Sequence, residues 1–316
     1  MRIVFMGTGE IALPSLDWLL TSPDVDVVGV FTQPDKKIGR KQILTPPEVK
    51  VRALAADIPV FQPHSFRKEP DAIAALESLH CDIAVVMAYG QILPRAVINA
   101  PRIACVNLHA SLLPRHRGAS PIQAAIRDGD AQSGITLMHI APKLDAGDMI
   151  LQSVIDLASD ETGGSLHDRL ADLGPGILEK GLPLLFAGKA ERQPQNEEQV
   201  TYSGKLGRED GVIDWSLPAP EIERLVRAYD PWPGTTTILP GGKKSRILKL
   251  FPFAETGKSN SELPGTLLDD KGALHVACGA DTSLRFTRNL QIEGKKRMAI
   301  SEFMKGASLE KGLKLG

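Results

Sequence analysis

Within residues 1–140, short apolar runs alternate with helix-like segments, and this alternation restricts the possible folds more than any other feature of the chain. The apolar runs lie at 2–6, 25–31, 59–61, 82–88, 104–108 and 134–140, and the helix-like segments near 10–20, 46–56, 70–79 and 120–127. Strand, helix and strand in series form a βαβ unit with parallel strands. The pattern predicts an α/β fold with a Rossmann-like, mainly parallel sheet.

The chain changes character after this region. A helix-like segment at about 163–187 is expected to be broken or capped by Gly174, Pro175, Gly176, Gly181 and Pro183. The polar stretch that follows is predicted to be a linker, and the short β-rich runs beyond it favour a small β-barrel. We therefore expect a Rossmann-like domain at 1–188, a linker at 189–203 and a barrel domain at 204–316.

Composition excludes several classes of protein. Apolar residues make up 42% of the chain and charged residues 24%, which is typical of a globular protein and argues against disorder. The longest apolar runs are of strand length, far short of the roughly 20 residues that a membrane helix needs. The first residues enter a strand directly, without a hydrophobic leader, so we expect a cytoplasmic protein that does not associate with membranes.

The cysteines and charges are also informative. Cys81, Cys105 and Cys278 are odd in number and form no C-x-x-C pair, so we expect reduced, buried thiols and no metal site. The net charge is −1, but residues from 204 onward carry 18 Lys and Arg against 14 Asp and Glu. This mild basic excess is compatible with RNA binding and does not establish it.

A glycine-containing turn follows the first apolar run. Gly7, Gly9 and Ala12 match the G-x-G-x-x-A form of the dinucleotide fingerprint, which makes an NAD-dependent oxidoreductase a rival interpretation. That fingerprint also needs an acidic residue at the tip of the second strand, where Thr32 and Gln33 stand instead. A tight turn between strand and helix is therefore the simpler interpretation.

Three polar residues are the best candidates for chemistry. Asn107 and His109 end an apolar strand and are two residues apart, so their side chains point to the same face at the edge where parallel sheets bind ligands. Asp145 follows the next strand, and a parallel sheet would return the chain to the same edge. A histidine beside a carboxylate and an amide donor is an arrangement suited to acyl transfer.

The motifs around these residues resemble those of the folate-dependent formyltransferases. The segment N-L-H-A-S-L-L-P-R-H-R-G at 107–118 is similar to the N-x-H-x-S-L-L-P-x-x-R-G signature of that family. Further similar motifs are F-T-Q-P-D at 31–35, Y-G at 89–90, L-D-A-G-D at 144–148, I-D-W at 213–215 and P-W-P-G at 231–234. The resemblance is strongest to the branch that formylates methionyl initiator tRNA, and it implies that the second domain is an OB-like barrel.

The resemblance implies a role for each matched residue. It makes Asn107, His109 and Asp145 the catalytic residues and 10-formyltetrahydrofolate the co-substrate, with no metal. It places the folate against a further set of residues, namely Ser111, Leu112, Leu113, Pro114, Met87, Tyr89 and Gly90, the last three through the backbone. It assigns no role to His116 and indicates no obligate protein partner.

The trio suits formyl transfer to an amine. An α-amino group titrates near pH 8 or below and so needs little activation. Asn107 is a donor for the developing oxyanion, which His109 supports as imidazolium beside Asp145, and Asp145 is the expected proton acceptor, directly or through water.

The acceptor amine is less constrained, because similar enzymes formylate an amino sugar linked to a nucleotide or a purine precursor. The resemblance to the initiator-tRNA branch implies that the basic loop at 36–42, with Arg40 and Lys41, contacts tRNA. The basic second domain also favours methionyl initiator tRNA as partner. An enzyme acting on an amino sugar remains the close alternative, and a non-catalytic RNA-binding protein is disfavoured by the intact trio.

Overall fold

The computed structural model describes residues 1–316 except 40, 242–244, 260, 269, 271 and 307–308. The described residues form two compact units. Unit 1 comprises Met1–Pro121, Gln132–Ile155 and His167–Ser203, and unit 2 comprises Ile122–Ala131, Asp156–Leu166 and Gly204–Gly316. The domain limits expected at 188 and 204 stay predictions.

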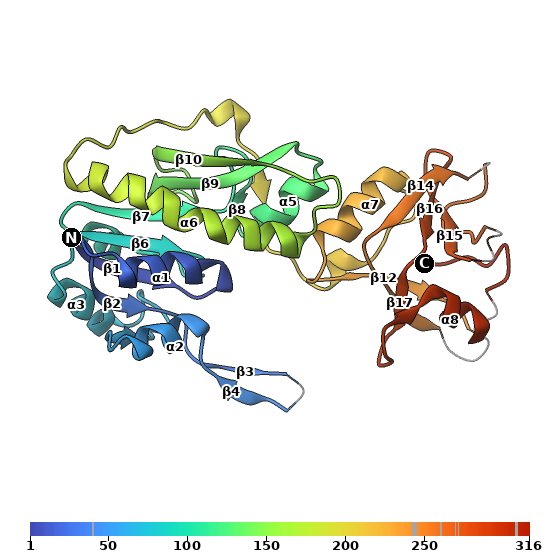
Figure 1. Cartoon of the computed structure of the whole chain (residues 1–316), viewed down its shortest axis with the longest axis horizontal. Coiled ribbons are helices and arrows are strands. Elements are labelled where there is room, and N and C mark those ends of the chain that lie inside the picture. Colours follow the sequence, from blue (N-terminus) through green and yellow to red (C-terminus); the bar gives the residue numbers. More distant parts are fainter. Residues whose placement is uncertain (40, 242–244, 260, 269, 271, 307–308) are drawn as a thin grey trace. The chain divides into compact units, whose positions relative to one another are not determined.

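Unit 1 is built on a seven-stranded sheet with the order β10-β9-β7-β6-β1-β2-β5 (Figure 1). The strands are β1 (Arg2–Gly7), β2 (Asp26–Phe31), β5 (Val60–Phe61), β6 (Ile83–Met87), β7 (Ala104–His109), β9 (Gln132–His139) and β10 (Met149–Asp156). Pairing is parallel from β7 through β6 and β1 to β2 and β5, and antiparallel between β7 and β9. Ile3, Val4, Phe5 and Met6 are fully buried, as expected for a parallel strand covered on both faces. The predicted Rossmann-like class is confirmed.

Of the helices up to residue 186, four lie where the sequence pattern predicts them, whereas the short helix at Arg95–Asn99 was not predicted and the one at Gly163–Phe186 is not broken as expected. They are α1 (Leu13–Thr21), preceded by the 3₁₀ turn η1 (Glu10–Ala12), then α2 (Glu48–Ala55), α3 (Pro70–Ser78), α4 (Arg95–Asn99), α5 (Pro121–Arg127) and α6 (Gly163–Phe186). The prediction that the segment at 163–187 is broken is wrong, because α6 continues through Pro175 and Pro183.

The buried face of α6 explains its continuity. Leu170, Leu178, Leu182 and Leu185 recur on one side of the helix and are buried. Burial of the four contributes about 6–12 kcal/mol in total, which offsets the cost of about 6 kcal/mol for the two interior prolines. Gly174 permits close packing as well, since an added Cβ would lie 2.1 Å from the Ser15 hydroxyl of α1.

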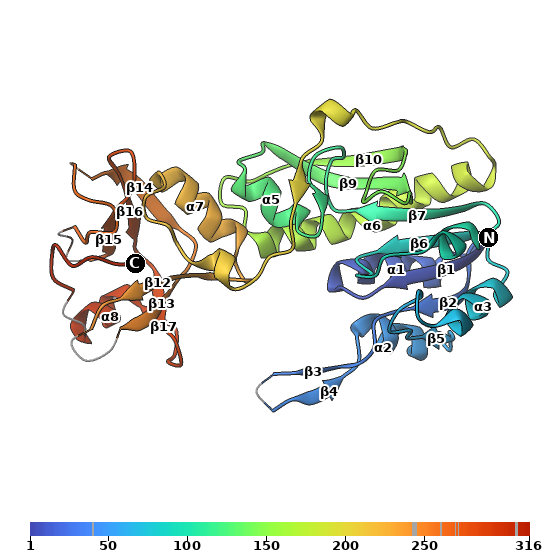
Figure 2. The same ribbon diagram turned by 180° about the vertical axis from the view of Figure 1, so that it is seen from behind.

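The segment expected as a loop at 36–42 is part of a hairpin. β3 (Lys36–Ile38) and β4 (Ile43–Thr45) pair antiparallel and project from the body of unit 1 (Figures 1 and 2). A second short pair joins β8 (Arg117–Gly118) to β11 (Tyr202–Ser203) in parallel. Residues 189–203, drawn in yellow, run back along β10 to reach it, with the 3₁₀ turn η2 (Glu197–Gln199) on the way.

Unit 2 has antiparallel sheets, which confirms the predicted change of fold after the parallel domain. One sheet has the order β12-β13-β17-β18 and the other β14-β16-β15. The elements are the 3₁₀ turn η3 (Glu209–Gly211), α7 (Ala219–Ala228), β12 (Thr235–Leu239), β13 (Arg246–Leu250), β14 (Ala254–Lys258), β15 (Leu274–Ala277), β16 (Thr282–Phe286), β17 (Asn289–Ile292), β18 (Met298–Ala299) and α8 (Ile300–Gly306). Residues of both sheets and both helices, including Ile222, Leu248, Leu284 and Phe303, share one apolar core.

The cysteines and the lengths of the helices can also be compared with the expectations from the sequence. Cys81, Cys105 and Cys278 are free and buried, and burial raises the pKa of each thiol. In the described part of the chain, no helix combines the length and apolarity needed to cross a membrane.

Candidate active site

The candidate site lies at the end of β7. Asn107 and His109 belong to this strand, whose two-residue period directs both side chains to one face of the sheet. Asn107 is half-buried, and the His109 side chain is only 7% exposed. The Nε2 atom of His109 lies 3.0 Å from the carbonyl oxygen of His116. Because a carbonyl can only accept, Nε2 carries the proton, and Nδ1 faces the other way.

Asp145 lies against this histidine. Its Oδ2 atom is 3.8 Å from Nδ1 of His109 and accepts a hydrogen bond of 2.8 Å from the backbone N–H of Gly118. Oδ1 takes part in neither contact. The Asp145 side chain is 16% exposed, so the pair is largely shielded from water while one carboxylate oxygen remains available to a reacting group.

The route by which Asp145 reaches the site differs from the expected one. The sequence argument assumed that the next strand is parallel, but β9 runs antiparallel to β7, with His109 opposite Thr136 and Val106 opposite His139. The end of β9 therefore lies away from the His109 tip. The loop after β9 brings Asp145 back, and Asp145 adopts a left-handed backbone conformation with φ of 48°. The prediction that Asp145 lies close to His109 is confirmed, but the parallel strand on which that prediction relied is wrong.

The sequence analysis missed the residues that hold this pair. They lie on two segments: His116 to Gly118 inside the signature motif, and residues 195–203 in the expected linker. Arg117 and Gly118 offered a signal, because both stand in the R-G that ends the motif. Residues 195–203 offered none, since their partners are up to 87 residues away in sequence.

The predicted folate residues form two adjoining loops. Ser111 and Leu113 are buried, and Leu112 and Pro114 are half-buried. Thr136 binds this loop from β9, because its hydroxyl donates to the Ser111 carbonyl and accepts from the Leu113 N–H. The loop is therefore fixed in shape, with Leu112 and Pro114 as its accessible side chains.

The second loop follows β6. The Tyr89 side chain packs against Phe66 in the core and its Met87 neighbour is buried, so neither side chain faces a ligand. Gly90, which has no side chain, is exposed and presents its backbone instead, whereas the Ala88 carbonyl already accepts a hydrogen bond from the Gly9 N–H. Ile92 adds a side chain that is 72% exposed.

The residues expected to contact tRNA lie on the β3–β4 hairpin. Lys41 is exposed in its turn, and Arg40 lies outside the described residues. The flanking apolar side chains are unusually accessible: Ile38 is 57% exposed, Ile43 61% and Leu44 62%. Grouped apolar side chains that are this exposed commonly mark a surface that binds another molecule.

The described residues at the tip of β2 do not supply the free acidic group that a dinucleotide cofactor needs for its ribose. At the tip of β2, Thr32 is buried, and the Asp35 carboxylate binds Lys50 at 2.9 Å and Gln62 at 2.7 Å. These hydrogen bonds from Gln62 and Lys50 lower the pKa of Asp35. Hydrogen bonds from Lys50 and Gln62 thus occupy most of its acceptor sites within the protein.

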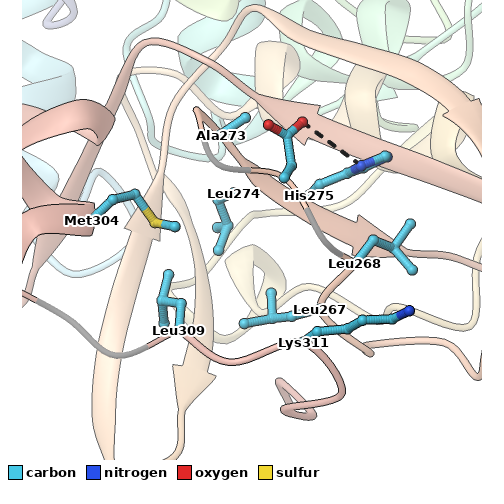
Figure 3. A pocket seen from close by; sticks show the side chains of 9 residues that line it. Leu267, Leu268, Ala273, Leu274, His275, Met304, Leu309 and Lys311 are labelled. Atoms are coloured by element: carbon cyan, nitrogen blue, oxygen red, sulfur yellow. Dashed lines mark ion pairs between the residues drawn. The ribbon is translucent and has the colours of Figure 1, made fainter.

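A second histidine–carboxylate pair lines a cavity of about 140 Å³ in unit 2 (Figure 3). His275 Nδ1 lies 3.9 Å from Asp270, but Arg285 binds the same carboxylate. Apolar side chains such as Leu267, Leu274, Met304 and Leu309 line it together with Asp270, His275 and Lys311. Without a free carboxylate or an amide donor, this cavity lacks the groups needed for acyl transfer. No group of three metal-ligating side chains occurs among the residues described here.

Comparisons with known proteins agree over both units. Residues 1–182 match the formyl transferase family model, and residues 205–308 match the model of the formyl transferase C-terminal domain. A methionyl-tRNA formyltransferase from Akkermansia muciniphila is 49% identical over 97% of this chain and 96% of its own length. One from Pseudomonas putida is 47% identical over 96% and 94%.

Among solved structures, an N-formyltransferase from Helicobacter canadensis in complex with folinic acid and dTDP-3-aminofucose shares the fold. It aligns with a TM-score of 0.63 and 17% identity, covering 91% of this chain and 99% of its own.

Proposed function

The chain belongs to the methionyl-tRNA formyltransferase family, and from this membership we propose that it transfers the formyl group of 10-formyltetrahydrofolate to the α-amino group of methionyl initiator tRNA. The product is N-formylmethionyl-tRNA for translation initiation. The observation that carries this conclusion is the 49% identity over 97% of the chain, which includes both the sheet unit and the basic segment from residue 204 onward. The sugar-acting neighbour at 17% identity supports the fold alone.

The two loops beside the trio suit a reduced folate. A pterin is flat and carries polar edges, so it needs apolar side chains against its faces and backbone groups at its rim. Leu112, Pro114 and Ile92 offer accessible apolar surface, and the exposed Gly90 offers backbone hydrogen-bonding groups. When bound there, the folate supplies the activated formyl carbon.

Asn107, His109 and Asp145 then divide the work. The Asn107 amide donates a hydrogen bond to the formyl oxygen as negative charge develops on it, a contribution of about 3–4 kcal/mol for one well-placed donor. His109 donates from Nε2 to the His116 carbonyl, which turns Nδ1 towards Asp145, and as imidazolium beside that carboxylate it supports the oxyanion. Asp145 uses Oδ2 for the Gly118 N–H, and its Oδ1 is available to accept the proton that the amine loses and to pass it to the folate nitrogen as the bond between that nitrogen and the formyl carbon breaks.

The β3–β4 hairpin, two arginine–aromatic pairs and the basic excess from residue 204 onward support a nucleic acid as the carrier of the amine. The β3–β4 hairpin combines exposed apolar side chains with Lys36, Lys37 and Lys41, which suits both bases and phosphates. We propose that this hairpin, with Arg40, contacts the acceptor arm. In unit 2, Arg288 and Arg297 lie over the rings of Phe253 and Phe251, at 4.0 and 3.7 Å from the ring centres. Such arginine–aromatic pairs add cationic and stacking surface to the basic excess of residues 204–316.

The deciding experiment compares acceptors. The protein is incubated with radiolabelled 10-formyltetrahydrofolate and one of three amines: methionyl initiator tRNA, a nucleotide-linked amino sugar, or an amino purine precursor. We expect label only in the tRNA. Label in the amino sugar, with none in tRNA, would reject the proposed acceptor while keeping the formyl-transfer chemistry.

A further inference from the structure

Residues 195–203, called the clasp below, bind the turn that carries Asp145 and the segment 116–118, whose His116 carbonyl lies against His109. In sequence this segment belongs to the polar stretch expected to link two domains, and it has no motif of its own. In the structure it ends in β11, which pairs with β8. A flexible tether would not need side-chain contacts with the site, yet the clasp makes several.

Gln195 contacts the turn that contains Asp145. Its Nε2 atom donates to the carbonyl oxygen of Asp145 at 2.7 Å and to that of Gly147 at 2.8 Å. Asp145 has a φ of 48°, a backbone conformation that non-glycine residues adopt infrequently. Two donations from one amide to this turn keep the backbone in that conformation and so determine where the carboxylate points.

Arg117 fixes Gln195 from the other side. Its Nε donates to Oε1 of Gln195 at 2.9 Å, so the amide oxygen is engaged and both Nε2 hydrogens face the turn. The Arg117 side chain is fully buried, and its Nη2 donates to Glu197 at 2.8 Å. Glu197 also pairs with Lys143 at 2.7 Å, and the hydrogen bonds from Arg117 and Lys143 lower its pKa to about 2.

The clasp reaches His109 as well, through the backbone of His116. The carbonyl that accepts from His109 belongs to His116, whose own N–H donates to the Thr201 hydroxyl at 2.8 Å. The next residue along, Arg117, donates its N–H to the Thr201 carbonyl at 2.9 Å. Gly118, which donates to Asp145, has a φ of 118°, and an added Cβ would lie 2.2 Å from the Ser203 carbonyl. The clasp therefore supports both partners of the His109–Asp145 pair.

We infer that Gln195, oriented by the buried Arg117, is a positioning residue for Asp145 in formyl transfer. It touches neither substrate nor reacting atoms, and it acts by holding the 145–147 turn so that the carboxylate faces His109 Nδ1. The inference rests on the proposed function, because it assumes that Asp145 takes part in the reaction. It assigns a catalytic-domain role to a segment whose sequence suggests only a linker.

The test is Gln195→Glu, which keeps the size of the side chain but removes both donors. The new carboxylate would repel the Asp145 and Gly147 carbonyls and displace the turn. A displacement on the order of 1 Å can cost about a hundredfold, so we expect kcat to fall by about tenfold to a hundredfold with the folate KM within about twofold of wild type. The matched control is Gln193→Glu, the same change at an exposed side chain two residues earlier, which should keep wild-type kcat.

A second readout does not need turnover. The Gly118 N–H donates to the Asp145 carboxylate, so its hydrogen exchange reports whether that carboxylate is in place. In Gln195→Glu the Gly118 amide should exchange faster, while the amides of β1 keep their protection. If Gln195→Glu fails to fold, Gln195→Met removes the donors without adding charge and is measured in the same way.

Unchanged kcat, or unchanged exchange at Gly118, in a folded variant would overturn the inference. A parallel loss of kcat and folate affinity that follows a lowered melting temperature would also overturn it, since that is the result of a merely structural role. Failure of the proposed function is distinguishable, because wild type would then not formylate methionyl-tRNA, while the Gly118 amide would still report the position of Asp145.

Discussion

Replacing Asp145 with asparagine removes one charge and leaves the shape of the site nearly unchanged. The amide oxygen of the new residue can still accept from the Gly118 N–H, which now binds Oδ2 at 2.8 Å, so the turn should persist. What disappears is the negative charge 3.8 Å from His109 Nδ1 and the carboxylate that receives the proton.

The distance sets the scale of the effect. At 3.8 Å and an effective dielectric constant of about 20, a carboxylate and an imidazolium attract by about 4 kcal/mol. Loss of that whole term would slow the reaction by about a thousandfold, and partial compensation by water reduces it. We therefore expect Asp145→Asn to lower kcat by about a hundredfold to a thousandfold, with folate affinity nearly unchanged.

The assay is the initial rate of methionyl-tRNA formylation at saturating folate, with thermal unfolding measured beside it. Asp148→Asn is the matched control, because Asp148 lies in the same loop and pairs with Arg192 at 3.1 Å on the exposed surface. It should retain nearly full activity. A folded Asp145→Asn enzyme within about fivefold of wild type would refute the assignment of Asp145 as proton acceptor and partner of His109.

Three further predictions concern stability, pH and salt. Gly174→Ala should destabilise the protein by about 1–3 kcal/mol through its contact with the buried Ser15 hydroxyl, whereas Gly176→Ala, with nothing within 4 Å, should stabilise it by about 0.5–1 kcal/mol; thermal unfolding of both decides. Because the pKa of Glu197 is lowered to about 2, its contribution to stability is present above the unfolded-state value near 4.5 and is lost as pH falls towards 2. The free energies of unfolding of wild type and Glu197→Gln, measured in urea, should therefore converge over that range. An equal difference at every pH would contradict the ion pair. A Lys295→Ala, Lys296→Ala double variant should flatten the salt dependence of tRNA affinity by up to about two units without changing folate affinity; a slope equal to that of wild type would remove these lysines from the interface.

Much of the fold could be predicted because its signals are local. A buried parallel strand needs a continuous apolar run, and each of β1, β6 and β7 has such a run in the sequence. Their positions therefore agree with the expected ranges to within about two residues. The failures have a common physical cause. Pro175 and Pro183 are helix breakers locally, but the face of α6 that packs in the core outweighs that preference, and no window of sequence shows what the helix will pack against.

In the candidate site, too, local features of the sequence could be predicted and contacts between distant segments could not. Asn107 and His109 could be identified because a strand period and a motif place them, and Asp145 because a second motif contains it. Its route to His109 could not, because the antiparallel direction of β9 depends on pairing with β7. The contacts of the clasp were equally inaccessible, since Gln195 meets Asp145 across 50 residues of chain.

The amino-acid sequence by itself determined the main strands and helices of the parallel sheet, their order and the residue types at the site, because these depend on the chemistry of neighbours along the chain. Only the tertiary structure decided which way β9 runs, that α6 survives two prolines, and that a polar stretch near residue 195 reaches back to hold the His109–Asp145 pair. Those outcomes depend on burial and hydrogen bonding between distant segments, and both come into being only when the chain has folded.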